Sequence, residues 1–174
     1  MNNVATQARK KERQAQVVQE VAQYVTFVIA GESYGVPVLK VQEIIGMTPI
    51  VPVPNSEEFI KGVINLRGSV VPVVDMRKRF RLEEREYDMF TVIIIVEVKG
   101  LLVGMIVDSV SDVADIPSGD IQQTPHLTSK IDREFISGIG HINEKLSIIL
   151  DIDRIFNANE IKSLDSTSSD TAQV

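Results

Sequence analysis

Side chains that could carry out covalent chemistry are few and scattered in this 174-residue chain. It contains no cysteine, which excludes a thiolate nucleophile, disulfides and cysteine-ligated zinc or iron–sulfur sites. Its two histidines, His126 and His141, are joined to no nucleophile by any sequence motif. We therefore expect surface or structural roles for both histidines.

Two glycine-containing runs resemble nucleotide-binding loops but complete neither motif. Ser69 follows Gly68 where a P-loop requires lysine, and Gly138-Ile139-Gly140 lacks the third glycine of the dinucleotide fingerprint. We therefore expect no bound nucleotide and no other cofactor.

Two pairs of aspartates, Asp112 with Asp115 and Asp151 with Asp153, have a spacing that could suggest calcium. Neither pair has the alternating ligands, central glycine and distal glutamate of a helix-loop-helix calcium site. We expect solvated or helix-capping carboxylates and no metal site. With no nucleophile–base pair, metal site or phosphate loop, the sequence predicts a protein that is not an enzyme.

Composition narrows the possible partners and location. The formal net charge of −6 argues against a general nucleic-acid binder, and three Tyr and no Trp supply few stacking platforms for single strands. The apolar run Thr91–Val98 is shorter than the roughly 20 residues of a membrane span. No apolar segment follows the basic residues 9–13, so we expect no signal peptide and a cytoplasmic protein.

The clearest pattern in the chain is an internal repeat. Phe59, Gly62, Asp75 and Phe80 recur 76 residues later as Phe135, Gly138, Asp151 and Phe156. Tyr34-Gly35-Val36-Pro37-Val38 matches Val103–Val107 at a second offset of 69 residues. The chain therefore reads as two copies of one small β-rich unit, each too small to be very stable alone, which we expect to pack together through an apolar seam.

These signals divide the chain into a core and two ends. Residues 1–22 are polar and predict a flexible segment, either a frayed helix or disordered, and the Ser/Thr/Asp-rich residues 159–174 predict a disordered tail. Residues 23–158 form the expected domain, with two β-barrel subdomains at roughly 23–86 and 87–156.

Alternating apolar residues and turn signals predict seven strands, with a Pro-, Ser-, Gln- and Thr-rich loop over about 114–134. Short helical turns are expected where apolar residues recur every three positions or where Asn or Asp can cap. The strands are Tyr24–Ile29, Tyr34–Val38, Ile60–Leu66, Val70–Val74, Thr91–Val98, Leu102–Val107 and Leu146–Leu150. The turns are Val38–Ile44, the segment after Asn55-Ser56, Asp75–Phe80 and a segment capped by Asp151 or Asp153 that ends at about Asn157.

The runs Phe59–Asp75 and Tyr34–Ile44 resemble the signature of the CheW-like chemotaxis coupling proteins. Val103–Asp108 and Phe135–Gly140 resemble further parts of that family, and the similarity extends from about Gln23 to Phe156. The resemblance implies a mainly β fold of two intertwined, pseudo-repeated five-stranded SH3-like barrels packed together, with a few short helices. It also implies a non-enzymatic adaptor.

The implied partners are the cytoplasmic tip of a chemoreceptor and the regulatory domain of the histidine kinase CheA. The protein would then work at the inner face of the membrane through receptor arrays, without inserting into the membrane. A chain of this length leaves no room for the phosphotransfer and ATP-binding modules of the kinase itself, so we expect a separate adaptor. Alternatives are a scaffold of a non-flagellar chemosensory pathway and a small β-barrel nucleic-acid module.

In the family, the receptor docks along the groove between the barrels and the kinase domain meets the barrel ends. Alternatives stay open at several positions: Val41 fits either a contact or the core, Glu43 and Arg67 either a contact or a solvated charge, and Asn65 and Gly68 either a contact or a tight turn. Carried over to this chain, the partner-binding residues would be Val41, Glu43, Lys61, Gly62, Asn65, Leu66, Arg67, Gly68, Ile93, Ile95, Leu102, Val103 and Met105.

Overall fold

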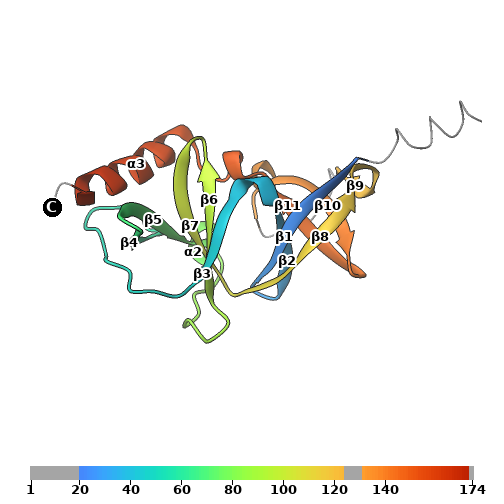
Figure 1. Cartoon of the computed structure of the whole chain (residues 1–174), viewed down its shortest axis with the longest axis horizontal. Coiled ribbons are helices and arrows are strands. Elements are labelled where there is room, and N and C mark those ends of the chain that lie inside the picture. The colour runs from blue at the N-terminus through green and yellow to red at the C-terminus, as the bar shows by residue number, and fades with distance from the viewer. Residues whose placement is uncertain (1–19, 124–130, 173–174) are drawn as a thin grey trace, which may run out of the picture.

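In the computed structural model, which describes residues 20–123 and 131–172, the chain forms two packed β-sheets (Figure 1). The five-stranded sheet has the order β3 (Val41–Gly46), β6 (Val92–Val98), β7 (Leu101–Val107), β5 (Ser69–Asp75), β4 (Ile60–Leu66). The six-stranded sheet has the order β8 (Ser109–Pro117), β1 (Val21–Ile29), β2 (Glu32–Pro37), β11 (Lys145–Leu150), β10 (Ile136–Ile142), β9 (Ile121–Gln122). The expected mainly β fold of two packed repeats is confirmed, with a sixth strand, β9, in one sheet.

Each sheet takes strands from both halves of the sequence. The β1–β2 hairpin pairs with β8 and β11 of the second copy, and the β6–β7 hairpin pairs with β3 and β5 of the first. Residue 86 therefore separates the two copies of the repeat, not the two sheets. Because each half supplies strands to both sheets, neither half holds a complete core of its own.

The repeat extends to backbone irregularities. Gln42 in β3 and Ser111 in β8, which are equivalent at the offset of 69, are the extra residues of two matching β-bulges. Gly35 and Gly104 are also equivalent, and a Cβ atom on Gly104 would lie 2.8 Å from Ile93 Cγ2. Glycine at these positions leaves room for the side chains that fill each sheet's inner face.

The apolar core has three parts. Ile64, Val73 and Ile93 belong to a cluster of the five-stranded sheet, and Tyr24 and Ile149 to one of the six-stranded sheet. The largest cluster contains residues of both sheets and forms the seam between them. The expected apolar seam is therefore present.

Two expected helical turns are instead extended or irregular. Of the expected turn Val38–Ile44, only Val38–Lys40 is a 3₁₀ turn, and Val41 and Ile44 lie on β3. The prediction failed here because a three-residue turn followed by a bulged strand gives the same apolar spacing as a helix. Asn55 has a φ of 60° and begins no helix.

The expected loop over 114–134 contains regular structure, since β8 runs to Pro117 and β9 follows it. Residues 124–130 of this loop lie outside the described residues.

Capping residues are confirmed at both copies. Asp75 accepts hydrogen bonds from the backbone N–H groups of Arg77 and Lys78 at the start of α2 (Met76–Arg79). Asp151 accepts one from Asp153 N–H in the 3₁₀ turn Ile152–Arg154. A further 3₁₀ turn, Ser118–Asp120, precedes β9, and another, Arg133–Phe135, precedes β10.

The prediction of a disordered C-terminal tail is wrong. Residues Ala158–Ala172 form helix α3, which packs on β5 and β4 (Figure 1). Asn157 and Glu160 exchange hydrogen bonds at its start, which satisfies N–H groups that a helix leaves free, and Leu164 is fully buried. The predicted flexible segment 1–22 lies outside the described residues except for its last three, of which Val21 and Ala22 begin β1.

Candidate partner-binding surface

Arg67 and Glu43 form an ion pair between the two edges of the five-stranded sheet. Arg67 Nη2 donates to Glu43 Oε1 at 2.8 Å. Glu43 lies on β3 and Arg67 follows β4, and these strands are the two edges of the sheet. The pair thus joins two edges that share no backbone hydrogen bonds, and the Arg67 side chain stays 76% exposed and free to meet a partner.

The tip of the β4–β5 hairpin presents Arg67 in a fixed backbone conformation. Arg67 and Gly68 have φ angles of 49° and 88°, the two positive values of a hairpin turn that follows the strand twist. Asn65 Oδ1 accepts a hydrogen bond from Gly68 N–H at 2.8 Å. Asn65 and Gly68 therefore shape the turn, the reading that the sequence left open beside partner contact.

The second copy of the repeat lacks this ion pair. Asn143 occupies the position equivalent to Arg67, with a φ of 50°, and Asp112 occupies the position equivalent to Glu43. Asn is a residue that such turns favour, whereas Arg is not. The geometry of the turn therefore does not explain why an arginine is present at position 67.

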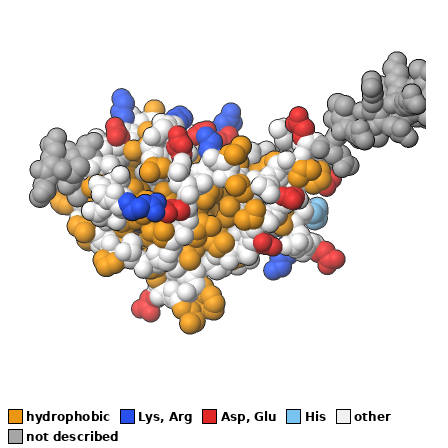
Figure 2. Space-filling model, in the orientation of Figure 1, with side chains coloured by type: hydrophobic (Ala, Val, Ile, Leu, Met, Phe, Trp, Pro, Cys, Tyr) orange, Lys and Arg blue, Asp and Glu red, His pale blue; other side chains and the backbone are white. Residues whose placement is uncertain are grey.

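An apolar surface adjoins the ion pair. Leu66 and Leu102 are partly exposed and pack with Ile45, Met47 and Ile50 against the cluster of the five-stranded sheet. Hydrophobic side chains gather across the face that carries β3 and continue toward the second sheet (Figure 2). Burial of such surface drives most protein association, so this face can hold an apolar partner element.

Val41 lies at the border between core and surface. It is partly exposed on β3, opposite Val96, and packs against the seam between the sheets. One part of the Val41 side chain thus lies in the seam and another part is accessible, so its position is compatible with either reading of the sequence.

Four of the residues expected to line the groove are instead core residues. Ile93, Ile95, Val103 and Met105 are all 0% exposed, because β6 and β7 lie inside the sheet and are covered on both faces. The prediction that these four residues contact a partner is therefore wrong. They support the surface from beneath.

Gly62 and Lys61 also differ from the expected contact. Gly62 is buried with a φ of 152°, and a Cβ atom there would lie 2.2 Å from the Val51 carbonyl oxygen. Its role is to let the Val51 backbone pair with Val63. Lys61 is exposed, and its ammonium lies 5.4 Å from the centre of the Tyr87 ring, a cation–π contact.

A polar network that the sequence did not predict fixes the segment between the two copies. Arg77 donates to both carboxylate oxygens of Asp108, at 2.9 and 2.6 Å, and Tyr87 OH donates to Asp75 Oδ2 at 2.8 Å. Burial raises the pKa of Asp108, but the hydrogen bonds from Arg77 and from the Ala30 N–H outweigh it, so the pKa is lowered overall. Long sequence separation leaves no local signal for such pairs.

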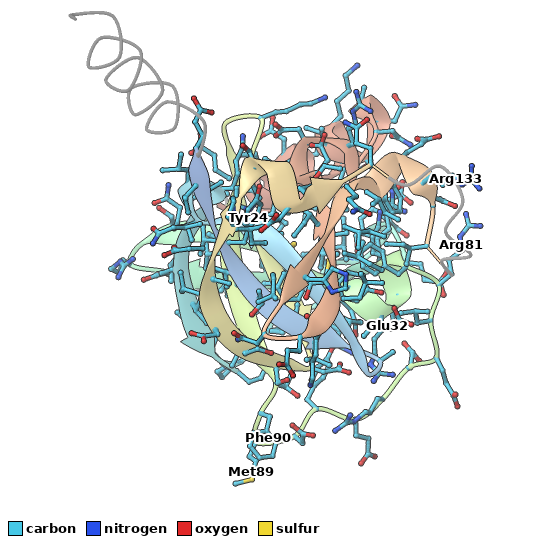
Figure 3. All side chains as sticks on the ribbon, turned by 90° about the vertical axis from the view of Figure 1, so that its right-hand side faces the viewer. Tyr24, Glu32, Arg81, Met89, Phe90 and Arg133 are labelled. Carbon is cyan, nitrogen blue, oxygen red and sulfur yellow. The ribbon has the colours of Figure 1, made fainter. Side chains whose placement is uncertain are left out.

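Met89 and Phe90 form an exposed apolar tip that points away from the body of the molecule (Figure 3). Two hydrogen bonds brace their loop: Asp88 Oδ1 accepts one from Phe90 N–H at 2.8 Å, and Asp88 N–H donates one to Thr91 Oγ1 at 2.9 Å. Sequence reasoning gave Met89 and Phe90 no role and missed the tip.

Within residues 20–123 and 131–172, no group of three or more His, Cys, Asp or Glu side chains is placed to hold a metal ion. The helices of the same ranges include none that is long and apolar enough to cross a membrane. What this part of the chain offers is a partly apolar face with a fixed arginine at its edge, an arrangement suited to protein contact.

Comparison with known proteins gives a consistent result. The model of the CheW-like domain matches residues 23–160. The chain is 34% identical over 146 residues to "Chemotaxis protein CheW" of Klebsiella aerogenes, covering 84% of this chain and 88% of that protein, and 35% identical over 136 residues to the protein of the same name from Rhizobium meliloti, covering 78% and 88%. The crystal structure of the scaffolding protein TtCheW from Thermoanaerobacter tengcongensis is similar, with a TM-score of 0.75, 37% identity, and coverage of 81% of this chain and 96% of that one.

Proposed function

Because this chain belongs to the family of CheW-like domain proteins, we propose that it links the cytoplasmic tip of a chemoreceptor to the regulatory domain of the kinase CheA. It is a chemotaxis scaffold protein and not an enzyme. The proposal places it in the cytoplasm, held at the inner face of the membrane by the receptor.

The observation that carries the proposal is the ion pair of Arg67 with Glu43 beside the apolar surface. It occurs in one copy of the repeat and not in the other, so the fold does not require it. Arginine is enriched at interfaces because its planar fork makes directed hydrogen bonds while its stem covers apolar surface. We assign partner contact to Arg67, Glu43, Val41, Leu66, Leu102 and Lys61, all of which are at least partly exposed.

Such a scaffold transmits a signal as a coupling free energy and not through chemistry. If receptor and kinase both touch one small rigid body, a change in one alters the affinity for the other, with coupling energies typically of about 1–3 kcal/mol. Repetition of the contacts in an array raises the effective affinity without new contacts. The closely packed seam between the sheets provides that rigidity.

Titration calorimetry of the full chain against a receptor-tip fragment and against the kinase regulatory domain of the same organism tests the proposal. We expect the wild-type chain to bind each fragment saturably. The variants Arg67→Ala and Val41→Lys should each bind the fragments more weakly than wild type does. Absence of binding to both fragments by the folded wild-type chain contradicts the proposal.

A further inference from the structure

Arg79, at the end of α2, lies in an aromatic box built from both copies of the repeat. Its guanidinium carbon lies 5.1 Å from the centre of the Phe59 ring, 4.8 Å from that of Phe135 and 5.6 Å from that of Phe156. The side chain is 13% exposed, so it is not available as a partner contact.

The box lies where the two copies meet. Phe59 is paired with Phe156 at a ring-centre distance of 5.7 Å, and Phe80 with Phe135 at 5.9 Å. Phe59 and Phe135 are equivalent in the repeat, as are Phe80 and Phe156, so the two aromatic pairs are related by the pseudo-symmetry. The residue equivalent to Arg79 is Ile155, which is fully buried. Arg79 therefore breaks the symmetry of the seam by placing a cation where the other copy has an apolar side chain.

A cation at this position needs partners, and the structure supplies three kinds. Besides the rings, Arg79 Nε donates to the Ile155 carbonyl oxygen at 3.0 Å, and Nη2 donates to Glu160 Oε1 at 3.0 Å. Burial lowers the pKa of Arg79, yet arginine stays protonated in proteins, so the charge must be held by these groups. Glu160 belongs to α3 and also accepts the Asn157 N–H of the helix start.

Helix α3 connects this box to the β4–β5 hairpin. Leu164 is buried in the seam cluster, and Ser168 Oγ donates to the Val70 carbonyl oxygen at 2.7 Å. Val70 lies on β5, three residues after Arg67. One end of α3 is thus attached to Arg79 and the other end braces the hairpin whose tip carries the exposed arginine.

We propose that Arg79 is a positioning residue that locks α3 against the β4–β5 hairpin and thereby holds Arg67 in its binding position. The inference rests on the proposed function, because it treats the hairpin tip as a partner contact. Arg79 acts through Glu160 and α3 and touches no partner itself.

The Arg79→Ile variant places in the first copy the residue that the second copy carries, so it keeps apolar packing and removes the lock. Arg79→Lys keeps the charge but not the planar fork. Lys78→Ala is the matched control, because Lys78 lies on the same helix and pairs with Glu84, not with α3. Glu160→Gln removes the negative charge of the ion-pair partner of Arg79. It is the second variant to measure if Arg79→Ile does not fold.

Amide hydrogen exchange measured on the full chain reports on the lock without any partner. In Arg79→Ile we expect the amides of α3 and of residues 66–70 to exchange at least about tenfold faster, while the amides of β6 and β7 keep their protection. Arg79→Lys should recover part of the protection, and Lys78→Ala should behave as wild type. Unchanged exchange in α3 for both Arg79→Ile and Glu160→Gln overturns the inference.

Calorimetry with the receptor-tip fragment and the kinase regulatory domain then measures the consequence for binding. We expect Arg79→Ile to lower the affinity for any fragment whose binding depends on Arg67 by about fivefold or more. Arg79→Lys should recover part of that affinity. Faster exchange in α3 with unchanged affinity would show that Arg79 holds the helix only, and would refute the positioning role. If the wild-type chain binds neither fragment, the proposed function fails, whereas the exchange of the hairpin amides still decides whether Arg79 locks it.

Discussion

Arg67 and Glu43 lie 2.8 Å apart across the two edges of the five-stranded sheet, with β6, β7 and β5 between their strands. Exposed ion pairs of this kind contribute about 0–1 kcal/mol to stability. Arg67 can therefore leave Glu43 for a carboxylate or carbonyl of a partner at small cost to the fold. The ion pair also restricts the Arg67 side chain in the free protein, and such restriction reduces the entropy lost on binding.

Arg67→Asn gives the first hairpin the turn residue of the second. Because Asn tolerates a positive φ well, we expect the free energy of unfolding to change by less than about 0.5 kcal/mol. Binding to the partner fragment should weaken by about 1 kcal/mol or more, as for an interface anchor. Thermal melts and calorimetry on the same samples check both values, and a loss of stability without loss of binding would reverse the assignment.

Exchanging the two charges separates closure of the sheet from partner contact. In the double variant Arg67→Glu with Glu43→Arg, the ion pair can re-form with its atoms interchanged. If the pair only joins the sheet edges, the double variant should bind like wild type. We expect instead that binding stays weak, by about 1 kcal/mol or more, because the arginine now sits on the wrong strand. Full recovery of binding would exclude a direct contact by Arg67.

Gly62 and Gly68 are both glycines with positive φ on the same hairpin, yet they should respond differently to alanine. A Cβ atom at Gly62 would meet the Val51 carbonyl oxygen at 2.2 Å, whereas one at Gly68 meets nothing within 4 Å. We expect Gly62→Ala to lose about 3 kcal/mol through overpacking, and Gly68→Ala about 1 kcal/mol through the backbone alone. Urea denaturation measures both, and equal losses would contradict the structural role of Gly62.

The sequence predicted seven of the eleven strands of the described residues, those with clear local signals, and did not predict β3, β8, β9 and β10. Turns such as Lys99-Gly100 and Arg67-Gly68 and the apolar runs beside them define hairpins directly. The membership of each hairpin in a sheet is different, because β1 pairs with β8 more than eighty residues away and such pairing leaves no periodic trace. The repeat alone indicated two units, and only the family resemblance implied that the two units are intertwined.

The sequence predicted the site less well, for two physical reasons. The run Ile93-Ile94-Ile95 reads as a buried strand, and only the order of the sheet shows that both of its faces are covered. Helix α3 was missed because its Ser/Thr/Asp-rich composition favours disorder. A signal was present in Asn157 followed three residues later by Glu160, the pattern of a capped helix start.

Leu164 should contribute substantially to stability. Its side chain is fully buried between α3 and the sheets, so Leu164→Ala is expected to destabilise the protein by about 2–3 kcal/mol. Lys162→Ala, on the exposed side of the same helix, is the control and should change stability by less than about 0.5 kcal/mol. Chemical denaturation of both variants is the measurement, and a neutral Leu164→Ala would mean that α3 is not docked in solution.

The Arg77–Asp108 pair should make stability depend on acid pH. The pKa of Asp108 is lower in the folded than in the unfolded chain, so its contribution is present above about pH 4 and is lost as the pH falls through the folded value. We expect Asp108→Asn to lose about 2 kcal/mol at neutral pH, since both side chains are largely buried. The difference between wild type and variant, measured by urea denaturation at several pH values, should shrink below about pH 4. A difference that is constant with pH would contradict this account.

The three tyrosines should make stability depend on alkaline pH in the opposite direction. Burial raises the pKa of Tyr24, of Tyr34 to about 12, and of Tyr87, whose pKa is raised further by its hydrogen bond to Asp75. A group with a higher pKa in the folded state contributes stability that is complete below its unfolded pKa, about 10 for tyrosine, and is lost as the pH rises toward the folded value. Because the chain has three Tyr and no Trp, absorbance of the tyrosinate reports on these residues alone. We expect no tyrosine to ionise near pH 10 in the folded protein and all three to do so in urea. Tyr87→Phe identifies the contribution of the residue nearest the surface, and a wild-type step near pH 10 that is missing in this variant would show that the bond to Asp75 does not persist in solution.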